Sequence, residues 1–199
     1  MPHYPSRMLV VARVAFGSWI TVEVLSWAKV LPITLEFTWL GLIITASGAW
    51  IALEIISAWL RRRGAQSLWA GTFIFALASQ CTDAFGDIFR LYGSYAWYDQ
   101  VAHFVGGSVL ALVIFNTLYN LEKAGRVKLP LGLHTLLSVF GAMAIGSLYE
   151  LEEYSEDVLF GSNRMGNAFD TGNDMLLNTI GACVMVFGIW HVVKKLRLT

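Results

Sequence analysis

Residues 129–149 read LPLGLHTLLSVFGAMAIGSLY and contain no aspartate, glutamate, lysine or arginine. A run of this length and composition is typical of a membrane-spanning helix, because a hydrocarbon core of about 30 Å needs roughly 20 apolar residues in helical form. A helix also satisfies its backbone amides internally, which hydrocarbon requires. The stretch therefore predicts an all-α membrane protein, and much of the remaining chain repeats the pattern.

Four more runs lack the same charged residues: 37–53, 64–82, 104–121 and 175–193. A sixth run, 8–31, contains Arg13, Glu23 and Lys29, but it is long enough to cross. Arg13 and Lys29 lie near its ends, where long basic side chains reach the membrane surface. Its length and the absence of a small-residue cleavage site predict that it is retained. We therefore expect six transmembrane helices in a single domain over residues 1–199.

The composition excludes several other classes of protein. Hydrophobic residues make up 56% of the 199 residues and charged residues 14%, whereas soluble domains have roughly 25% charged residues. The 14% of aromatic residues argue against disorder. Cys81 and Cys183 are too few for a disulfide-stapled scaffold. Acidic and basic residues number 14 each, so no net charge points to nucleic acid.

Lysine and arginine alternate between the two sides of the six expected spans. Cytoplasmic loops carry the excess of these residues, so both termini are expected in the cytoplasm. The residues on that side are Arg7, Arg61, Arg62, Arg63, Lys123, Arg126, Lys128, Lys194, Lys195 and Arg197. The opposite loops contain only Arg90 and Arg164. We expect Glu54 to pair with Arg61 or a neighbour, and His134 to lie at the cytoplasmic interface.

Acidic residues gather on the non-cytoplasmic side. Ten of the 14 acids map there: Asp83, Asp87, Asp99, Glu150, Glu152, Glu153, Glu156, Asp157, Asp170 and Asp174. They fall at the ends of four expected spans, so converging helix ends bring their carboxylates together. Spacings of three and four residues place side chains on one helix face. This holds for Asp83/Asp87, Asp99/His103, Glu150/Glu153/Asp157 and Asp170/Asp174, and Asn178 extends the last stripe.

Ionised carboxylates near hydrocarbon need neutralisation. A divalent metal is the first interpretation, with six expected ligands: Asp99, His103, Glu150, Glu153, Asp170 and Asp174. Mixed carboxylate and imidazole ligands suit Zn, Mn or Fe, whereas an oxygen-only set suits Ca or Mg. Asp83, Asp87, Asp157 and Asn178 are expected to support these ligands, and Arg90 or Arg164 to hold a phosphate or headgroup. The catalytic residue is left open.

Two other interpretations of the acids stay open. Adjacent carboxylates can share protons, which is how intramembrane proton relays are built. Alternatively, Asp99 and Asp170 cap helices at their positive ends, His103 donates to a carboxylate, and the remaining acids face water.

Three ordered motifs carry a family resemblance: YDQVAHF at 98–104, YELEE at 149–153 and FDTGNDM at 169–175. The chain resembles the YjdF-type inner-membrane proteins of bacteria, and more weakly the VanZ-like membrane proteins. The resemblance covers roughly residues 83–188. It implies an inner (plasma) membrane location, and its motifs point to the same residues as the charge pattern. It implies no activity, because the family is one of unknown function.

The sequence thus favours a multi-pass inner-membrane protein that binds a divalent cation at an outward-facing site and acts on a lipid-linked or headgroup substrate. In that mechanism one uncoordinated carboxylate is the base for a metal-bound water. A proton- or cation-coupled transporter is one alternative. A non-catalytic scaffold for a partner protein is the other. The expected partners are membrane lipid and a lipid-linked substrate, with no nucleic acid.

Overall fold

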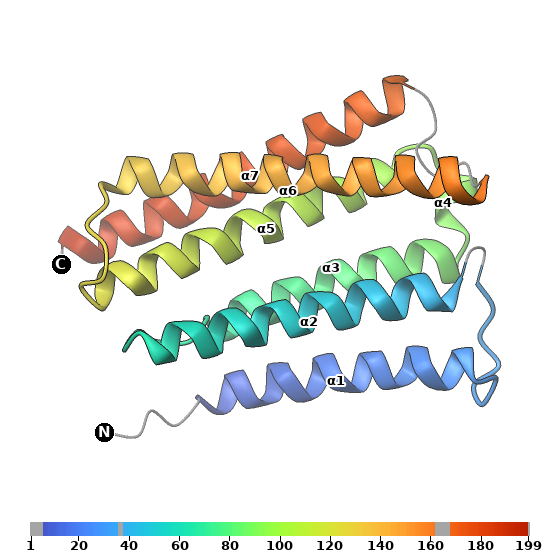
Figure 1. Ribbon diagram of the computed structural model, residues 1–199, viewed down its shortest axis with the longest axis horizontal. Coiled ribbons are helices and arrows are strands. Elements are labelled where there is room, and N and C mark those ends of the chain that lie inside the picture. Colours follow the sequence, from blue (N-terminus) through green and yellow to red (C-terminus); the bar gives the residue numbers. More distant parts are fainter. Residues whose placement is uncertain (1–5, 36–37, 162–167, 199) are drawn as a thin grey trace. The chain divides into compact units, whose positions relative to one another are not determined.

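The computed structural model describes residues 6–35, 38–161 and 168–198 (Figure 1). This part of the chain contains helices and no strand. The helices are α1 (Arg7–Trp27), α2 (Trp39–Arg62), α3 (Ala70–Ile88), α4 (Leu91–Ser94), α5 (Tyr98–Lys123), α6 (Leu131–Phe160) and α7 (Ala168–Leu198). The expectation of an all-α protein is therefore confirmed for the described residues.

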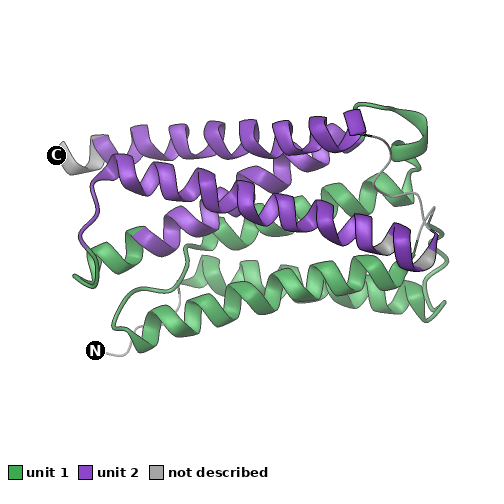
Figure 2. Cartoon of the chain, turned by 45° about the horizontal axis from the view of Figure 1, so that its top comes forward, with its two compact units in different colours: residues 1–98, 119–127 green, residues 99–118, 128–199 purple. Residues whose placement is uncertain are grey.

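Contacts divide the chain into two compact units, coloured separately in Figure 2. Unit 1 comprises residues 1–98 and 119–127, and unit 2 comprises residues 99–118 and 128–199. The division falls within α5, whose last turn belongs to unit 1.

Unit 1 is built on α1, α2 and α3, and each of these helices packs against the other two. Phe16 of α1 stacks on Trp50 of α2, with ring centroids 6.4 Å apart. One turn away the Arg13 guanidinium donates to both oxygens of the Glu54 carboxylate, at 2.5 and 2.7 Å. We expected Glu54 to pair with Arg61 or a residue near it in sequence; its partner is instead Arg13, because the antiparallel packing of α1 and α2 places Arg13 beside it.

Unit 2 consists of α6, α7 and most of α5. Its core is small and close-packed: Ala111, Phe115, Ala142, Ala182 and Val186 are fully buried. His134 is also fully buried and packs edge-on to Phe115, with ring centroids 5.8 Å apart. His134, expected at the cytoplasmic interface, lies in the first turn of α6 and is enclosed by protein rather than exposed at the surface.

Among the described residues, five helices are long and apolar enough to cross a membrane: α1, α2, α5, α6 and α7. The expected span at 64–82 corresponds to α3, which begins only at Ala70 and runs on to Ile88. Gly64 has a φ of +75° just beyond α2, and the residues that follow are not helical. Helix α3 is less apolar than these five helices, because it includes Gln80, Asp83 and Asp87.

The helices of unit 2 extend further than the uncharged runs from which they were predicted. Helix α6 continues 11 residues past Tyr149, and α7 begins seven residues before Met175. Helix α5 begins at Tyr98 rather than at Phe104. Uncharged runs mark only the hydrophobic centre of a span, whereas a helix continues into its polar ends. The motif acids consequently lie on helices rather than in loops.

Candidate metal centre

A close crossing of α5 and α7 positions the candidate site. A Cβ atom added at Gly107 would lie 2.1 Å from the Asn178 carbonyl oxygen, and one at Gly181 would lie 2.0 Å from the Phe104 carbonyl oxygen. Ser108 Oγ lies 2.9 Å from the Gly181 carbonyl oxygen and 2.8 Å from that of Phe104. Glycine and serine let two membrane helices approach this closely. One turn toward the acidic end, the crossing brings the His103 face of α5 against α7.

At its Nε2 atom, His103 faces acidic residues from two helices. Asp99 Oδ1 of α5 lies 3.6 Å from His103 Nε2, and Asp174 Oδ1 of α7 lies 3.7 Å from the same nitrogen. Each of the three residues offers one ligand atom, and these atoms lie within 4.8 Å of one another. The side chains of His103 and Asp174 are 10% and 5% exposed, whereas that of Asp99 is 38% exposed. The trio is thus open to the exterior only on its Asp99 side.

The other imidazole nitrogen faces a different pair of residues. Glu150 Oε1 of α6 lies 3.8 Å from His103 Nδ1, and the Asn178 side-chain amide of α7 lies 3.3 Å from it. Whether Nδ1 donates or accepts depends on the tautomer of the ring and on the orientation of the amide. The two nitrogens of one histidine therefore face separate polar partners, contributed by all three helices of unit 2.

Two buried carboxylates in this cluster have oxygens without a hydrogen-bond partner among the described residues. These oxygens are Asp174 Oδ1 and both oxygens of Glu150. Asp174 is 3% exposed and Glu150 is 5% exposed. Buried polar atoms are almost always hydrogen-bonded, so exceptions call for an explanation such as an ion or a proton. Both side chains reach the imidazole of His103 at distances too long for a hydrogen bond.

The structure brings together part of the predicted set. Asp99, His103, Glu150, Asp174 and Asn178 form the cluster just described. Asp170 is half-buried one turn before Asp174, and its charge acts on Glu150 and Asp174.

Other predicted residues lie outside this cluster. Glu153 is 8% exposed, Asp157 is half-buried, and neither is among the three residues whose ligand atoms converge. Asp83, Asp87 and Arg90 belong to unit 1. Arg164 lies outside the described residues.

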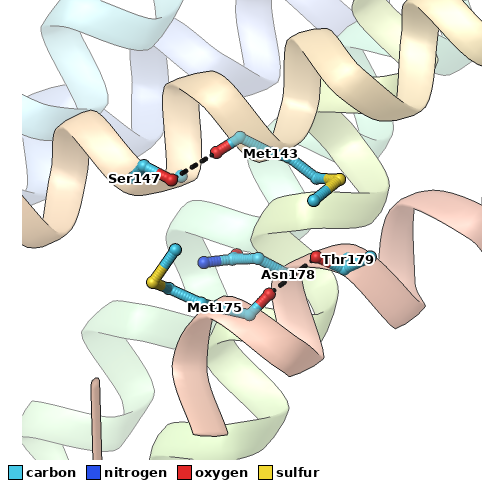
Figure 3. Close-up of a pocket in the computed structure, with 6 residues that line it drawn as sticks. Met143, Ser147, Met175, Asn178 and Thr179 are labelled. Carbon is cyan, nitrogen blue, oxygen red and sulfur yellow. Dashed lines mark hydrogen bonds between the residues drawn. The ribbon is translucent and has the colours of Figure 1, made fainter. Parts of the chain in front are cut away.

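A small pocket lies beside the cluster, between α6 and α7 (Figure 3). Its lining residues are Met143, Gly146, Ser147, Met175, Asn178 and Thr179. Ser147 and Thr179 donate their hydroxyls to carbonyl oxygens of their own helices, at Met143 and Met175. Asn178 thus borders the pocket and also reaches the His103 ring. A Cβ at Gly146 would lie 3.1 Å from the Asn178 amide nitrogen, so a larger residue there would require this side chain to shift slightly.

The structure also buries polar residues to which the sequence assigned no role in the site. Asn116, His134 and Ser138 are fully buried in unit 2, and Glu23 is 1% exposed in unit 1. His134 and Ser138 are four residues apart on α6, which was a usable signal. Nothing in the sequence identified which helix would cover them.

Comparison with protein families gives one result. The model described as "Predicted membrane protein (DUF2238)" matches residues 12–195. The chain belongs to this family. The match spans nearly all of the chain and agrees with the resemblance to YjdF-type membrane proteins. Comparisons with curated proteins and with solved structures gave no match. This DUF2238 member is therefore a multi-pass membrane protein, and its function has to be argued from the site itself.

Proposed function

We propose that this DUF2238 protein binds a divalent metal ion between Asp99, His103 and Asp174. The observation that carries the proposal is the convergence of one ligand atom from each residue within 4.8 Å. The orphaned oxygen of Asp174 supports it, because a cation would satisfy a buried acceptor that lacks a donor. One imidazole with two carboxylates suits Zn, Mn or Fe better than Ca or Mg, which favour oxygen alone.

In this proposal His103 binds the metal through Nε2, since both acidic ligands lie on that side. Nδ1 then carries the ring proton and faces the Glu150 carboxylate at 3.8 Å, while the Asn178 amide, whose nitrogen lies 3.3 Å from Nδ1 in the structure, would turn its oxygen toward the ring to accept the proton's hydrogen bond. Such outer partners fix the tautomer and orientation of a metal-binding histidine and raise its basicity. Glu150 and Asn178 are accordingly supporting residues, and the six-ligand set predicted from sequence contracts to three ligands.

Three protein ligands leave coordination positions for water and substrate, as in catalytic rather than structural sites. A metal ion held by Asp99, His103 and Asp174 would supply a nucleophilic water at neutral pH. Asp170 is the candidate base, because it is half-buried and its charge acts on Asp174. The ligands lie near the ends of membrane-spanning helices, where headgroups of membrane lipids are the substrates at hand. We therefore propose metal-assisted hydrolysis of a lipid-linked or headgroup substrate.

The proposed location is the outer face of the inner membrane. This location follows from the unequal distribution of lysine and arginine between the two sides of the membrane. It also assumes six membrane crossings, of which α3 is one. Helix α3 has 19 residues, which at 1.5 Å per residue span about 28 Å, close to the thickness of the hydrocarbon core. It also packs against both α1 and α2.

Metal analysis of the purified protein tests the proposal. We expect close to one equivalent of Zn, Mn or Fe in the wild type, and loss of it in His103→Ala and Asp174→Asn. Glu152→Gln is the matched control, because it removes an acid from an exposed position on α6. A correctly folded wild-type protein that takes up none of these metals would overturn the proposal, as would equal metal content in the His103→Ala protein.

A second candidate function, proton translocation, is favoured by one observation. Buried polar side chains continue through unit 2 away from the acidic cluster, at Asn116, His134 and Ser138. Chains of acids, histidines and amides are the usual material of proton relays. Proton flux into proteoliposomes that is lost in both Asp174→Asn and His134→Phe would favour this function. Flux equal to that of empty vesicles would exclude it.

A further inference from the structure

A second group of titratable side chains lies in unit 1, apart from the residues proposed to bind metal. Glu23 of α1 is 1% exposed, and its Oε2 atom has no hydrogen-bond partner among the described residues. The groups that act on it are the Trp19 indole one turn earlier, the Asp83 carboxylate and the Cys81 thiol. Glu23 is therefore a buried acid whose neighbours supply no positive charge.

Among the described residues, no ion pair joins Glu23 to a basic side chain. Arg13 is already bonded to both oxygens of Glu54. Helix α2 contains no titratable side chain between Trp39 and Leu53. Because Arg13 pairs with Glu54 and the two helices are antiparallel, this part of α2 runs beside Glu23. Helix α3 contributes Cys81, Asp83 and Asp87, of which only the acids carry charge.

Asp83 is held in a different environment from Glu23. The Tyr92 hydroxyl donates to Asp83 Oδ1 at 2.7 Å. The Tyr92 ring is fixed by an edge-on contact with Tyr98, with centroids 5.2 Å apart, and the Tyr98 hydroxyl donates to the Thr82 carbonyl oxygen. Gly86 makes room for both rings, because a Cβ there would lie 2.3 Å from Tyr92 and 2.5 Å from Tyr98. A hydrogen bond donated to a carboxylate favours its charged form.

We propose that Glu23 and Asp83 form a proton-binding site in unit 1, in which Glu23 carries the proton and Asp83 stays ionised. A proton fits this site better than a metal ion. Glu23 has an indole N–H and a thiol as neighbours, and neither is a ligand for a hard cation. No set of three ligand atoms that includes Glu23 or Asp83 converges among the described residues. The site is independent of the metal proposal.

Labelling with a hydrophobic carbodiimide tests the site in the intact protein. The reagent accepts the proton of a carboxylic acid and adds the carboxylate oxygen to its central carbon. The resulting O-acylisourea rearranges to a stable N-acylurea, so no other reactant is needed. Peptide mass spectrometry then identifies the labelled residue. Glu54 is the internal control, since it lies in the same unit and both of its carboxylate oxygens accept hydrogen bonds from Arg13.

We expect label at Glu23 and none at Glu54. Above its midpoint, labelling of Glu23 should fall about tenfold per pH unit, because one unit changes the protonated fraction tenfold. Asp83→Asn should move the midpoint to lower pH, since it removes the neighbouring negative charge. Zn²⁺ should leave the label at Glu23 unchanged, whatever the outcome at the metal centre.

Several outcomes would overturn the proposal. One is absence of label at Glu23 over the whole pH range in which the wild-type protein stays folded. Another is equal label at Glu23 and Glu54, which would show that burial and pairing do not govern the reaction. Protection of Glu23 by Na⁺ at constant pH and ionic strength would identify a cation site instead of a proton site.

Discussion

Gly107 of α5 and Asn178 of α7 are in direct contact through the backbone: a Cβ at position 107 would lie 2.1 Å from the Asn178 carbonyl oxygen. The side chain of the same Asn178 lies 3.3 Å from His103 Nδ1. One helix crossing thus determines both the distance between α5 and α7 and the environment of the central histidine.

Gly107→Ala is expected to destabilise the protein although alanine favours helices. The added methyl group overlaps backbone that cannot move away, and overpacking of this kind costs about 1–3 kcal/mol. Gly188→Ala on α7 is the control, because nothing lies within 4 Å of the Cβ position there. It should be neutral or stabilising by up to about 1 kcal/mol. Thermal unfolding in detergent measures both, and equal midpoints would contradict the close crossing.

Asn178→Leu is expected to weaken metal binding without removing a ligand. The substitution keeps a similar volume but takes away the amide that orients His103, and loss of such a partner typically costs about 10- to 100-fold in affinity. Thr179→Val is the comparison, because the Thr179 hydroxyl bonds only to its own helix at Met175 in the structure. Titration with Zn²⁺ distinguishes the two. Unchanged affinity in Asn178→Leu would show that the amide does not support the histidine.

Arg13 and Glu54 are expected to be energetically coupled. Arg13→Gln or Glu54→Gln alone leaves one charge without its partner inside unit 1, at a cost of about 2 kcal/mol after allowing for partial exposure. The double variant removes both charges and should be less destabilised than the sum of the two single variants. Unfolding free energies of all four proteins form the test. Strict additivity would mean that the bidentate contact contributes nothing.

Variants with a single cysteine test how many helices cross the membrane and in which direction they cross. In a background lacking Cys81 and Cys183, Gln66→Cys and Lys128→Cys lie on the predicted cytoplasmic side, and Ser94→Cys lies on the other; all three positions are exposed. A membrane-impermeant maleimide added to intact cells should label only Ser94→Cys. Labelling of Gln66→Cys together with Ser94→Cys would show that α3 does not cross. Labelling confined to Lys128→Cys and Gln66→Cys would reverse the orientation.

Removal of the metal is expected to destabilise unit 2. The oxygens of Asp174 and Glu150 without partners lie in this unit, so a bound cation relieves repulsion there and stabilises the folded state by mass action. A chelator should therefore lower the unfolding temperature of the wild type and leave that of His103→Ala unchanged. An equal effect on both proteins would place the metal elsewhere.

Much of the fold could be predicted because hydrocarbon restricts what a chain can do. Uncharged runs of about 20 residues have no alternative to a helix there, and they located α2, α5, α6 and α7 directly. The ends of the helices were harder to predict, because a helix that leaves the hydrocarbon continues on polar residues. For this reason α6 and α7 exceed their predicted spans, and α3 begins six residues late.

A cluster of carboxylates around His103 could be predicted from the sequence, but which acids lie closest to this histidine could not. Helical spacing placed Asp99 with His103, and Asp174 with Asn178, on single faces, and the structure confirms both pairs. Spacing along one helix cannot show which face meets which neighbour, so Glu153 was expected as a ligand equal to Glu150. For the same reason, the contact of Arg13 with Glu54 could not be predicted from the sequence.

By itself, the sequence determined that this chain is a helical membrane protein with its acids gathered toward the ends of its helices, since both properties follow from composition along the chain and the cost of charge in hydrocarbon. Only the tertiary structure decided which of those acids meet. Contact between helices depends on rotation and close approach, and here these depend on two glycines, Gly107 and Gly181, whose missing side chains let α5 and α7 bring His103 to Asp174.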